Sequence, residues 1–421
     1  MRKSINLLII FISGILINNA ARAQWVPDGI PVCSSGKCSQ YETVTDGACG
    51  VIVAWRDWRN DKPGIYAQRI DSNGVALWTP GGVAICTNGA PNDPQLVSDD
   101  HGGAIIIWED YRSGDSYVYA QRVDEHGSVL WAVDGFAVCP FNWGPYDGQN
   151  ACQIAHDGHG GAIITWVESR SSTELDRNIY AQRIDGEGAL VWPSMGVSIC
   201  AASGYQEYPQ IAADGLGGAT IVWMDQRSGS GYDYDMQDIY AQRINGNGLV
   251  LGTANGVAVC VADGYQAWPV LAADGLGGAI IAWSDLRSGS ASGDIYARRI
   301  HSNCTVLWST NGVAICTEIG FQSPRSLCSD GAGGVIIVWI DDRSGDSDIY
   351  AQRINEFGSV SWTANGTPVC SASSYQGNPG IIADGSGGGI VAWDDTRCEH
   401  PSDAIDDYAQ RIDADGPALW A

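Results

Sequence analysis

The stretch Asp214-Gly-Leu-Gly-Gly-Ala-Thr-Ile-Val-Trp223-Met-Asp-Gln-Arg227, followed by Asp238-Ile-Tyr-Ala-Gln-Arg-Ile244, decides the fold because the chain repeats it seven times. One tyrosine marks each copy: Tyr66, Tyr119, Tyr180, Tyr240, Tyr296, Tyr350 and Tyr408. The intervals between them run from 53 residues (Tyr66 to Tyr119) to 61 residues (Tyr119 to Tyr180). A repeat of this length indicates an array of one supersecondary unit.

Each copy contains four segments that favour β-strands. In the fourth copy they are Pro209–Ala213, Ala219–Asp225, Ile239–Ile244, and Leu249–Cys260 with a break near Asn255-Gly256. They are rich in Val, Ile, Tyr and Trp, and glycine-rich turns separate them. No segment has a sustained helical period. The sequence therefore predicts an all-β, seven-bladed β-propeller with four-stranded antiparallel blades. A two-sheet sandwich and a β-solenoid are the alternatives.

The ends of the chain favour a closed propeller. Residues Trp25–Cys33 match the tail end of a repeat, and the chain stops at Ala418–Ala421, where that tail is missing. We expect the N-terminal strand to complete the last blade and to cover open sheet edges. Residues 24–421 would then form a single propeller domain.

The first 23 residues have the pattern of a secretory signal peptide. A basic start precedes an apolar stretch, Leu7–Ile17, and an Ala21-Arg22-Ala23 cleavage site. A membrane anchor is the alternative, but a span needs about 20 apolar residues. We expect a secreted protein without membrane insertion, either extracellular, periplasmic or at the cell surface.

The mature chain is strongly acidic. Without Arg2, Lys3 and Arg22, 20 basic residues face 48 acidic ones, which gives a net charge of −28. Fourteen of the remaining arginines occupy two fixed repeat positions, and the other four are Arg56, Arg177, Arg298 and Arg325. An acidic surface repels phosphate backbones, so we expect no nucleic-acid partner.

The lengths of the connections vary at one end of each predicted blade. The turns between strands one and two and between strands three and four keep their length. The interval from the repeat cysteine to the next Asp runs from 13 residues (Cys33 to Asp46) to 18 (Cys139 to Asp157), and the interval from Arg to Tyr from 7 (Arg59 to Tyr66) to 13 (Arg227 to Tyr240). Variable loops on a rigid scaffold are typical of a binding surface. Tolerance of insertions is the alternative.

Thirteen cysteines fall into two groups. Seven occupy one repeat position: Cys33, Cys86, Cys139, Cys200, Cys260, Cys316 and Cys370. Equivalent positions on packed sheets are ~10 Å apart, which is too far for a disulfide, so we expect buried apolar thiols. The others are Cys38, Cys49, Cys152, Cys304, Cys328 and Cys398, among which Cys38 with Cys49 is a possible local pair.

The motif Trp-x-Asp-x-Arg occurs in nearly every copy, which argues for a structural role of residues such as Asp225 and Arg227. An axial active site needs one set of groups, not seven. Arg243 and its equivalents receive the same interpretation. We find no catalytic constellation, so no catalytic residue is predicted. Asp233, Asp235 and Asp238 could bind calcium through carboxylate oxygens, although a solvated acidic loop is the alternative.

Aromatic residues in the variable connections are the candidate ligand-binding residues. They are Trp143, Tyr146, Tyr205, Tyr208, Tyr265, Trp268, Phe321 and Tyr375. Flat amphipathic side chains suit sugar stacking or peptide contact. An aromatic residue followed by Gln recurs, as in Tyr205-Gln206, which indicates packing between blades for part of this set. Trp143, Tyr208 and Trp268 lie outside that pattern and are the stronger candidates.

The wording of the repeat, such as Ser344-Gly-Asp-Ser-Asp-Ile-Tyr-Ala-Gln-Arg-Ile354, resembles repeats of exported bacterial β-propeller proteins. The resemblance covers the mature chain and implies the fold, not an activity. More distantly the chain is similar to sialidase-type propellers, but their S-x-D-x-G-x-x-W box is absent.

Our leading hypothesis is a monomeric, secreted scaffold that holds a glycan or a protein on its variable loops. The alternatives are a glycoside hydrolase or lyase with an axial site, and a structural cell-surface component. The hydrolase predicts a carboxylate pair that faces the pore and occurs in single copies rather than at repeated positions, whereas the scaffold predicts none.

Overall fold

The computed structural model describes residues 31–33, 37–139, 148–170, 177–229, 236–289, 293–397, 406–416 and 418–419. The described strands form seven antiparallel sheets, mostly of four strands, and the one helical segment in these ranges is a short 3-10 turn, Arg59–Asp61. The fold class is therefore the seven-bladed β-propeller, as the sequence predicts. None of the described segments forms a helix with the length and apolar character to span a bilayer.

The chain divides into two compact units, which are described separately. The first comprises residues up to Glu174, Tyr180–Ser198 and Gly215–Gly217; the second comprises Leu175–Ile179, Ile199–Asp214 and Gly218–Ala421. The boundary falls within the strands β11 and β12.

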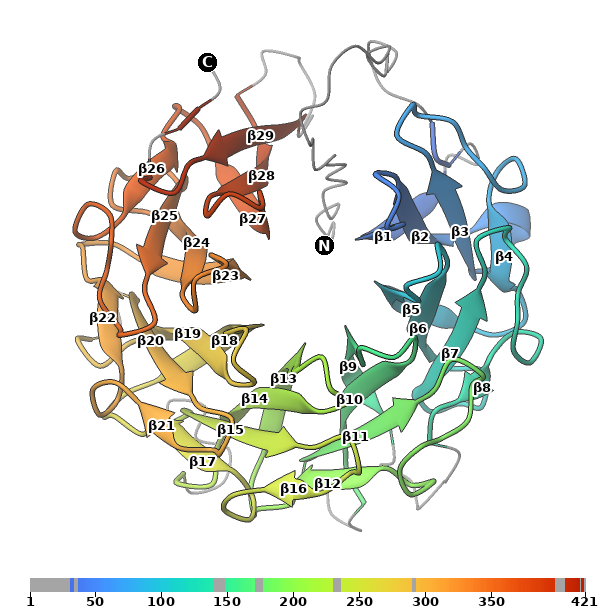
Figure 1. The fold of residues 1–421 in the computed structure, drawn as a ribbon, viewed down its shortest axis with the longest axis horizontal. Helices are drawn as coiled ribbons and strands as arrows, with labels where there is room; N and C mark the ends of the chain where they lie inside the picture. Colours follow the sequence, from blue (N-terminus) through green and yellow to red (C-terminus); the bar gives the residue numbers. More distant parts are fainter. Residues whose placement is uncertain are drawn as a thin grey trace. The chain divides into compact units, whose positions relative to one another are not determined.

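The first three sheets belong chiefly to the first unit, and each places its strands in chain order (Figure 1). Their strands are β1 (Cys38–Thr45), β2 (Val51–Asp57), β3 (Gly64–Ile70) and β4 (Val83–Cys86); β5 (Pro91–Ser98), β6 (Ala104–Asp110), β7 (Tyr117–Val123) and β8 (Phe136–Ala137); and β9 (Asn150–His156), β10 (Ala162–Glu168), β11 (Asn178–Ile184) and β12 (Val197–Cys200).

Four sheets belong to the second unit. Their strands are β13 (Gln206–Ala213), β14 (Ala219–Asp225), β15 (Asp238–Ile244), β16 (Val250–Leu251) and β17 (Val257–Cys260); β18 (Gln266–Ala273), β19 (Ala279–Asp285), β20 (Asp294–Ile300), β21 (Val306–Leu307) and β22 (Val313–Cys316); β23 (Gln322–Ser329), β24 (Val335–Asp341), β25 (Asp348–Ile354) and β26 (Thr367–Cys370); and β27 (Gln376–Ala383), β28 (Gly389–Asp395) and β29 (Asp406–Ile412). The last sheet has three described strands. The expected closing strand, Trp25–Cys33, and the signal peptide lie almost wholly outside the described residues, so both stay predictions.

The repeated motif forms a buried hydrogen-bond network in each sheet. Trp283 Nε1 donates to Asp285 Oδ2 at 2.8 Å, and Arg287 Nη2 donates to the same oxygen at 2.5 Å. The Arg287 guanidinium also lies 3.8 Å above the ring centroid of Tyr296 and donates to the carbonyl oxygen of Asn311. The equivalent ion pair recurs in all seven sheets, with Glu168 in the acidic position of the third. The structural interpretation of this motif is therefore confirmed.

The second fixed arginine joins neighbouring sheets. Arg353 pairs with Asp330 in the first turn of its own sheet, at 2.9 Å. Its Nη1 donates to the carbonyl oxygen of Ala414, in the last turn of the following sheet, at 3.0 Å. Arg299 makes the same pair of contacts with Asp274 and the Glu356 carbonyl. These bonds add to apolar packing between adjacent sheets, such as Val222 and Met224 against Trp283.

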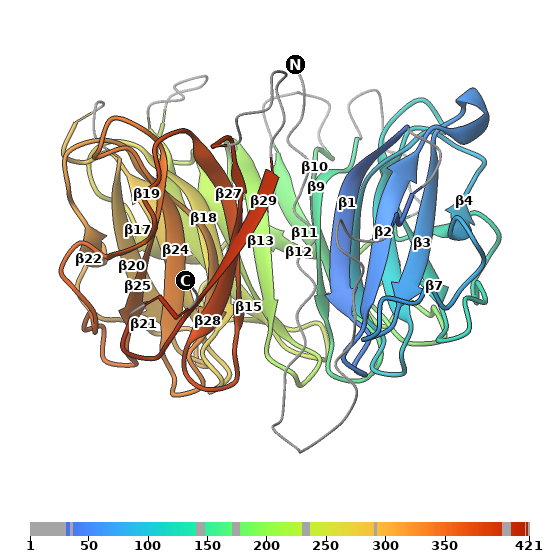
Figure 2. The same cartoon turned by 90° about the horizontal axis from the view of Figure 1, so that it is seen from above.

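Within each sheet the described fixed turns lie at one end, and the strand ends that border the connections of variable length lie at the other (Figure 2). This placement follows from the antiparallel order of the strands. We call the second end the variable-loop end. The first strand of each sheet starts there and contacts the first strand of the next sheet within its unit.

Candidate functional site

Each first strand carries a β-bulge close to the variable-loop end. The pairing register shifts between Glu207 and Gln210 in β13, between Ala267 and Val270 in β18, and at the matching place in the other five first strands. A bulge leaves one residue unpaired and re-aims its side chain, and such bulges are common beside active sites.

The amino acid at the bulge position differs in every copy. The unpaired residues with positive φ are Gln40 (55°), Asp93 (47°), Ala151 (50°), Tyr208 (52°), Trp268 (49°) and Asn378 (47°). A left-handed backbone is costly for residues other than glycine and tends to be retained where function requires it. In β23 the position is held by Pro324, whose pyrrolidine fixes φ near −65°, and the register slips one residue later, at Arg325. The repeat thus keeps the bulge and varies the side chain that it presents.

In the second unit the bulge side chains surround a shallow pocket of about 190 Å³. Tyr208, Gln210, Trp268, Pro269, Val270, Pro324 and Arg325 line it. Tyr208 is 54% exposed and Trp268 is 39% exposed. Two large aromatic side chains from adjacent sheets therefore border one opening, on backbone held in an unfavourable conformation.

Trp268 is held in place by its neighbours. Its ring meets Tyr265 edge-on, with centroids 6.2 Å apart, and Phe321 edge-on at 6.0 Å. Its backbone N–H lies 3.4 Å from the sulfur of Met224, on the preceding sheet. Edge-to-face pairs of this kind stabilise by about 0.5–1.5 kcal/mol beyond area burial. The indole is therefore pre-oriented, and about two fifths of its surface stays available to a ligand.

In the first unit the equivalent bulges carry a polar cluster. Glu109 is 8% exposed and its Oε1 accepts a hydrogen bond from the Ala151 backbone N–H at 2.8 Å. Burial raises the pKa of Glu109, and the nearby Asp93 carboxylate raises it further. Asp93 accepts hydrogen bonds from Gln40 Nε2 and Asn92 Nδ2. Glu109 directly follows the repeat tryptophan, Trp108, and no other copy has Glu at that position.

A second pair of carboxylates is specific to the last sheet. Asp394 and Asp407 are directly opposite in the pairing of β28 with β29, and the other copies have Ile or Val where Asp407 stands. Burial raises the pKa of Asp407 to about 6, with the carboxylates of Asp394 and Asp406 adding to the effect. Asp394 accepts a hydrogen bond from Asn378, the bulge residue of the same sheet, at 2.8 Å. Copy-specific carboxylates are therefore present in both units, which the hydrolase hypothesis requires and the scaffold hypothesis does not predict; that such a pair faces the pore stays a prediction.

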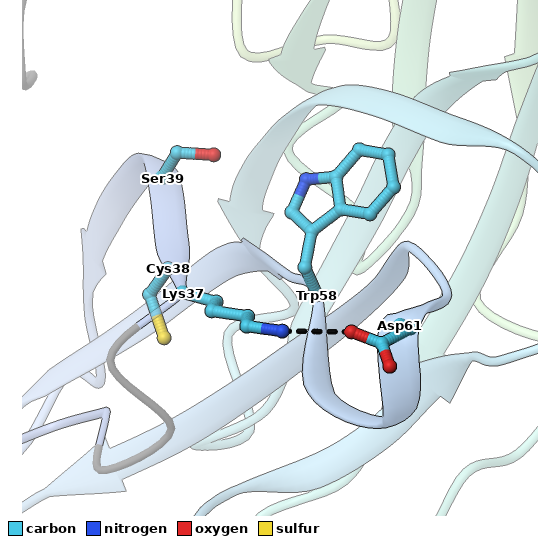
Figure 3. Close-up of a pocket in the computed structure, with 5 residues that line it drawn as sticks. All are labelled: Lys37, Cys38, Ser39, Trp58 and Asp61. Carbon is cyan, nitrogen blue, oxygen red and sulfur yellow. Dashed lines mark hydrogen bonds and ion pairs between the residues drawn. The ribbon is translucent and has the colours of Figure 1, made fainter.

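A further pocket lies beside the start of β1, with a volume of about 560 Å³ (Figure 3). Lys37, Cys38, Ser39, Trp58 and Asp61 line it, and Lys37 Nζ lies 2.7 Å from Asp61 Oδ1. Both members of this ion pair are well exposed, so the pair contributes little to stability. The Trp58 ring already has the Arg56 guanidinium 4.7 Å from its centroid, and the charge pair is neutralised, so this pocket offers a ligand fewer available groups than the aromatic pocket.

The predicted aromatic residues separate into three groups. Tyr208 and Trp268 border the pocket, and Tyr375 is exposed beside Arg325. Tyr265 and Phe321 pack against Trp268, whereas Tyr205 is buried with the Arg177 guanidinium 5.2 Å from its ring centroid. Trp143 and Tyr146 lie outside the described residues. One sequence signal could have located the bulges: in four copies the bulge residue stands directly before a proline. These pairs are Asp93-Pro94, Tyr208-Pro209, Trp268-Pro269 and Asn378-Pro379.

Of the suggested calcium ligands, Asp233 and Asp235 lie outside the described residues. Asp238 is buried and accepts a hydrogen bond from Ser228 Oγ at 2.5 Å. The same bond joins Ser288 to Asp294 and Ser344 to Asp348. This recurrence gives Asp238 a turn-stabilising role, and calcium binding stays a prediction.

The cysteine predictions need two corrections. Cys38 forms a disulfide with Cys33, whereas the predicted partner Cys49 is an exposed free thiol. The bulge strand β1 brings Cys38 back beside Cys33, five residues earlier. Five repeat cysteines are buried thiols as expected: Cys86, Cys139, Cys200, Cys260 and Cys316. Cys370 is only half-buried, and Cys33 is in the disulfide. The surroundings are polar rather than apolar: Cys260 Sγ lies 3.7 Å from Asp285 Oδ2 and 3.3 Å from Arg287 Nη2. Burial raises the pKa of Cys260 to about 12, so it is a neutral thiol.

Comparisons with known proteins give likeness at the level of the fold. No family model matches the chain, and no curated protein matches it. Similar solved structures include an alpha-L-arabinanase of Penicillium chrysogenum complexed with arabinobiose, with 14% identity, a TM-score of 0.42, and coverage of 72% of this chain and 87% of that one. A GH93 alpha-L-arabinofuranosidase of Fusarium graminearum has 14% identity, a TM-score of 0.41 and coverage of 72% and 86%.

An acylaminoacyl peptidase of Pyrococcus horikoshii is also similar, with 10% identity and a TM-score of 0.46. The likeness covers 91% of this chain and 52% of the peptidase, so this chain spans about half of that protein. At these identities and TM-scores, the likenesses assign no substrate or reaction to this chain.

Proposed function

We propose that this protein binds a glycan at the aromatic pocket of its second unit, with Tyr208 and Trp268 as the stacking platform. The observation that carries this proposal is the pair of exposed aromatic side chains presented by positive-φ bulges on adjacent first strands. A sugar ring has apolar faces that pack on an aromatic ring and hydroxyl groups at its edge that need polar partners. Gln210 and Arg325 supply polar groups at the rim of the same pocket.

The size of the pocket favours a sugar over a folded protein partner. Stable protein interfaces bury about 800 Å² on each side, whereas this site is one small opening bordered by two exposed rings. Pre-oriented side chains on paired strands also lower the conformational entropy lost on binding. A short oligosaccharide therefore matches the site better.

The test is glycan binding by the purified protein and its variants. Wild type is screened on a glycan array, and the affinity for each hit is measured by calorimetry. We expect Trp268→Ala and Tyr208→Ala each to weaken binding about tenfold or more, because tenfold corresponds to about 1.4 kcal/mol and one stacked ring contributes on that scale.

Phe357→Ala is the matched control. Phe357 is 77% exposed and lies in the turn after β25, at the fixed-turn end, so its removal should leave affinity unchanged. Retention of full affinity in both pocket variants would exclude this pocket as the binding site. Absence of binding to any glycan would favour a protein ligand.

Hydrolysis of a glycan is the second candidate, supported by Glu109 and Asp93. A glycosidase needs one carboxyl group held protonated as an acid and a second carboxylate nearby. The raised pKa of Glu109 suits the first role, and Asp93 provides the second group. Glycans that bind are incubated with enzyme and the products separated; Glu109→Gln should abolish any cleavage and retain binding. If wild type leaves every bound glycan uncleaved, the hydrolase candidate is excluded and glycan binding without catalysis remains.

A further inference from the structure

Arg325 differs from the other arginines of the described chain in having no hydrogen-bond or ion-pair partner among the described residues. The fourteen arginines at the two repeat positions each pair with a carboxylate. Arg56 donates to Asn92, Arg177 pairs with Glu207, and Arg298 donates to the Val259 carbonyl. Among the described residues, Arg325 neither donates a hydrogen bond nor forms an ion pair. Arg56 and Arg298 also lack a carboxylate partner, but each donates to a protein oxygen, so Arg325 is the arginine whose donors are available to a ligand in the described chain.

The backbone places this guanidinium at the aromatic pocket. Pro324 cannot adopt the positive φ found at the other bulges, and the unpaired residue of β23 is consequently Arg325. Arg325 lines the pocket with Tyr208 and Trp268, and the Tyr375 hydroxyl lies within electrostatic reach. The Arg325 residue is exposed; desolvation by the surrounding atoms lowers its pKa, but an arginine stays charged in proteins. The site thus holds a solvent-exposed cation with no carboxylate partner among the described residues.

The chemical complement of such a group is a planar anion. A guanidinium offers N–H donors in a fork that matches a carboxylate in a bidentate manner, and these charge-assisted bonds are roughly twice as strong as neutral ones. The negative charge of the whole chain opposes the approach of a polyanion. A ligand with one isolated carboxylate on an otherwise neutral chain avoids most of that repulsion.

We propose that Arg325 makes this pocket selective for glycans that carry a uronic acid, with the sugar ring on Trp268 and Tyr208 and its carboxylate on Arg325. The inference rests on the proposed glycan-binding function and specifies its ligand class.

The test compares three tetrasaccharides by calorimetry on the full mature chain: one with a single glucuronic acid, its methyl ester, and the version with glucose in that place. We expect wild type to bind the acid about tenfold or more tightly than the two neutral probes. Arg325→Gln should remove that preference and leave the affinity for the neutral probes unchanged. Because Arg325 forms no hydrogen bond or ion pair with the described residues, this variant should have the same melting temperature as wild type.

Lys62→Gln is the control, since it removes an exposed cation of the first unit and should preserve the preference. Equal affinities of wild type for all three probes, or an unchanged preference in Arg325→Gln, would overturn the inference and leave glycan binding standing. Failure of wild type to bind these probes and every glycan on an array would instead remove the proposed function. A sulfated tetrasaccharide that binds more tightly than the uronate, and loses that advantage in Arg325→Gln, would overturn the assignment to a carboxylate.

Discussion

Replacing Tyr208 with glycine and with alanine should separate the cost of its backbone from the contribution of its ring. Both variants lose the ring, but alanine keeps a Cβ at φ 52° and glycine does not. The left-handed conformation costs a residue with a Cβ about 1–2 kcal/mol, whereas glycine in a strand costs about 0.5–1 kcal/mol in chain entropy. The difference predicts that Tyr208→Gly is more stable than Tyr208→Ala by about 0.5–1 kcal/mol.

Gln210 provides the comparison, because it lies in the same strand two residues later without a positive φ. There the order should be reversed, with Gln210→Gly less stable than Gln210→Ala by about 0.5–1 kcal/mol. Urea unfolding followed by tryptophan fluorescence gives the four midpoints at constant slope. If glycine is the less stable choice at both positions, the bulge is not strained and the argument that strain marks this site is wrong. Tyr208→Gly should also lose glycan affinity, which would place stability and function in opposition at one residue.

Three other predictions concern the framework and the polar cluster. The pKa of Glu109 is raised in the folded state, so ionised Glu109 destabilises the fold once the pH rises above its unfolded pKa of about 4.3. In thermal melts, Glu109→Gln should therefore be more stable than wild type at pH 7 and close to it at pH 4. An equal stability difference at both pH values would contradict the raised pKa. Asp285→Ala removes the acceptor shared by Trp283 and Arg287 at full burial, and should destabilise by about 3–5 kcal/mol in urea; a loss below 1 kcal/mol would refute the structural role of the motif. Reducing the Cys33–Cys38 disulfide should lower the free energy of unfolding by about 2 kcal/mol, the loop-entropy value for so short a loop. Peptide mapping of unreduced protein should find these two cysteines linked and Cys49 alkylated; a Cys38–Cys49 peptide would show that the pairing is wrong.

The sequence was sufficient for the strands because their signal is local and repeated. Ala219–Asp225 matches β14 residue for residue, Ile239–Ile244 lies within β15, and the expected break near Asn255-Gly256 separates β16 from β17. Seven copies also identified Asp225 and Arg227 as framework, since a residue required in every sheet is governed by packing that every sheet shares.

The candidate site could be predicted only in part. Tyr208 and Trp268 stood out as aromatic residues outside a repeated position, but their orientation depends on a register shift that involves the partner strand. That Arg325 lacks a hydrogen-bond or ion-pair partner among the described residues likewise depends on its tertiary neighbours. The local sequence does not show which arginines of the described chain have such partners. The Cys33–Cys38 disulfide was not predicted, because Cys33 occupies the repeat position expected to hold a free thiol and Cys49 was the only local partner considered for Cys38.

The arginine that joins adjacent sheets also affects how such a protein can evolve. Arg353 brings the donor and the Ala414 carbonyl brings the acceptor, and each copy of the repeat encodes one of each. A gene segment duplicated or deleted in register would therefore arrive with compatible joints at both borders. Changes in copy number can then proceed without redesign of the framework, while point substitutions at one bulge codon per copy alter the side chain that the bulge presents.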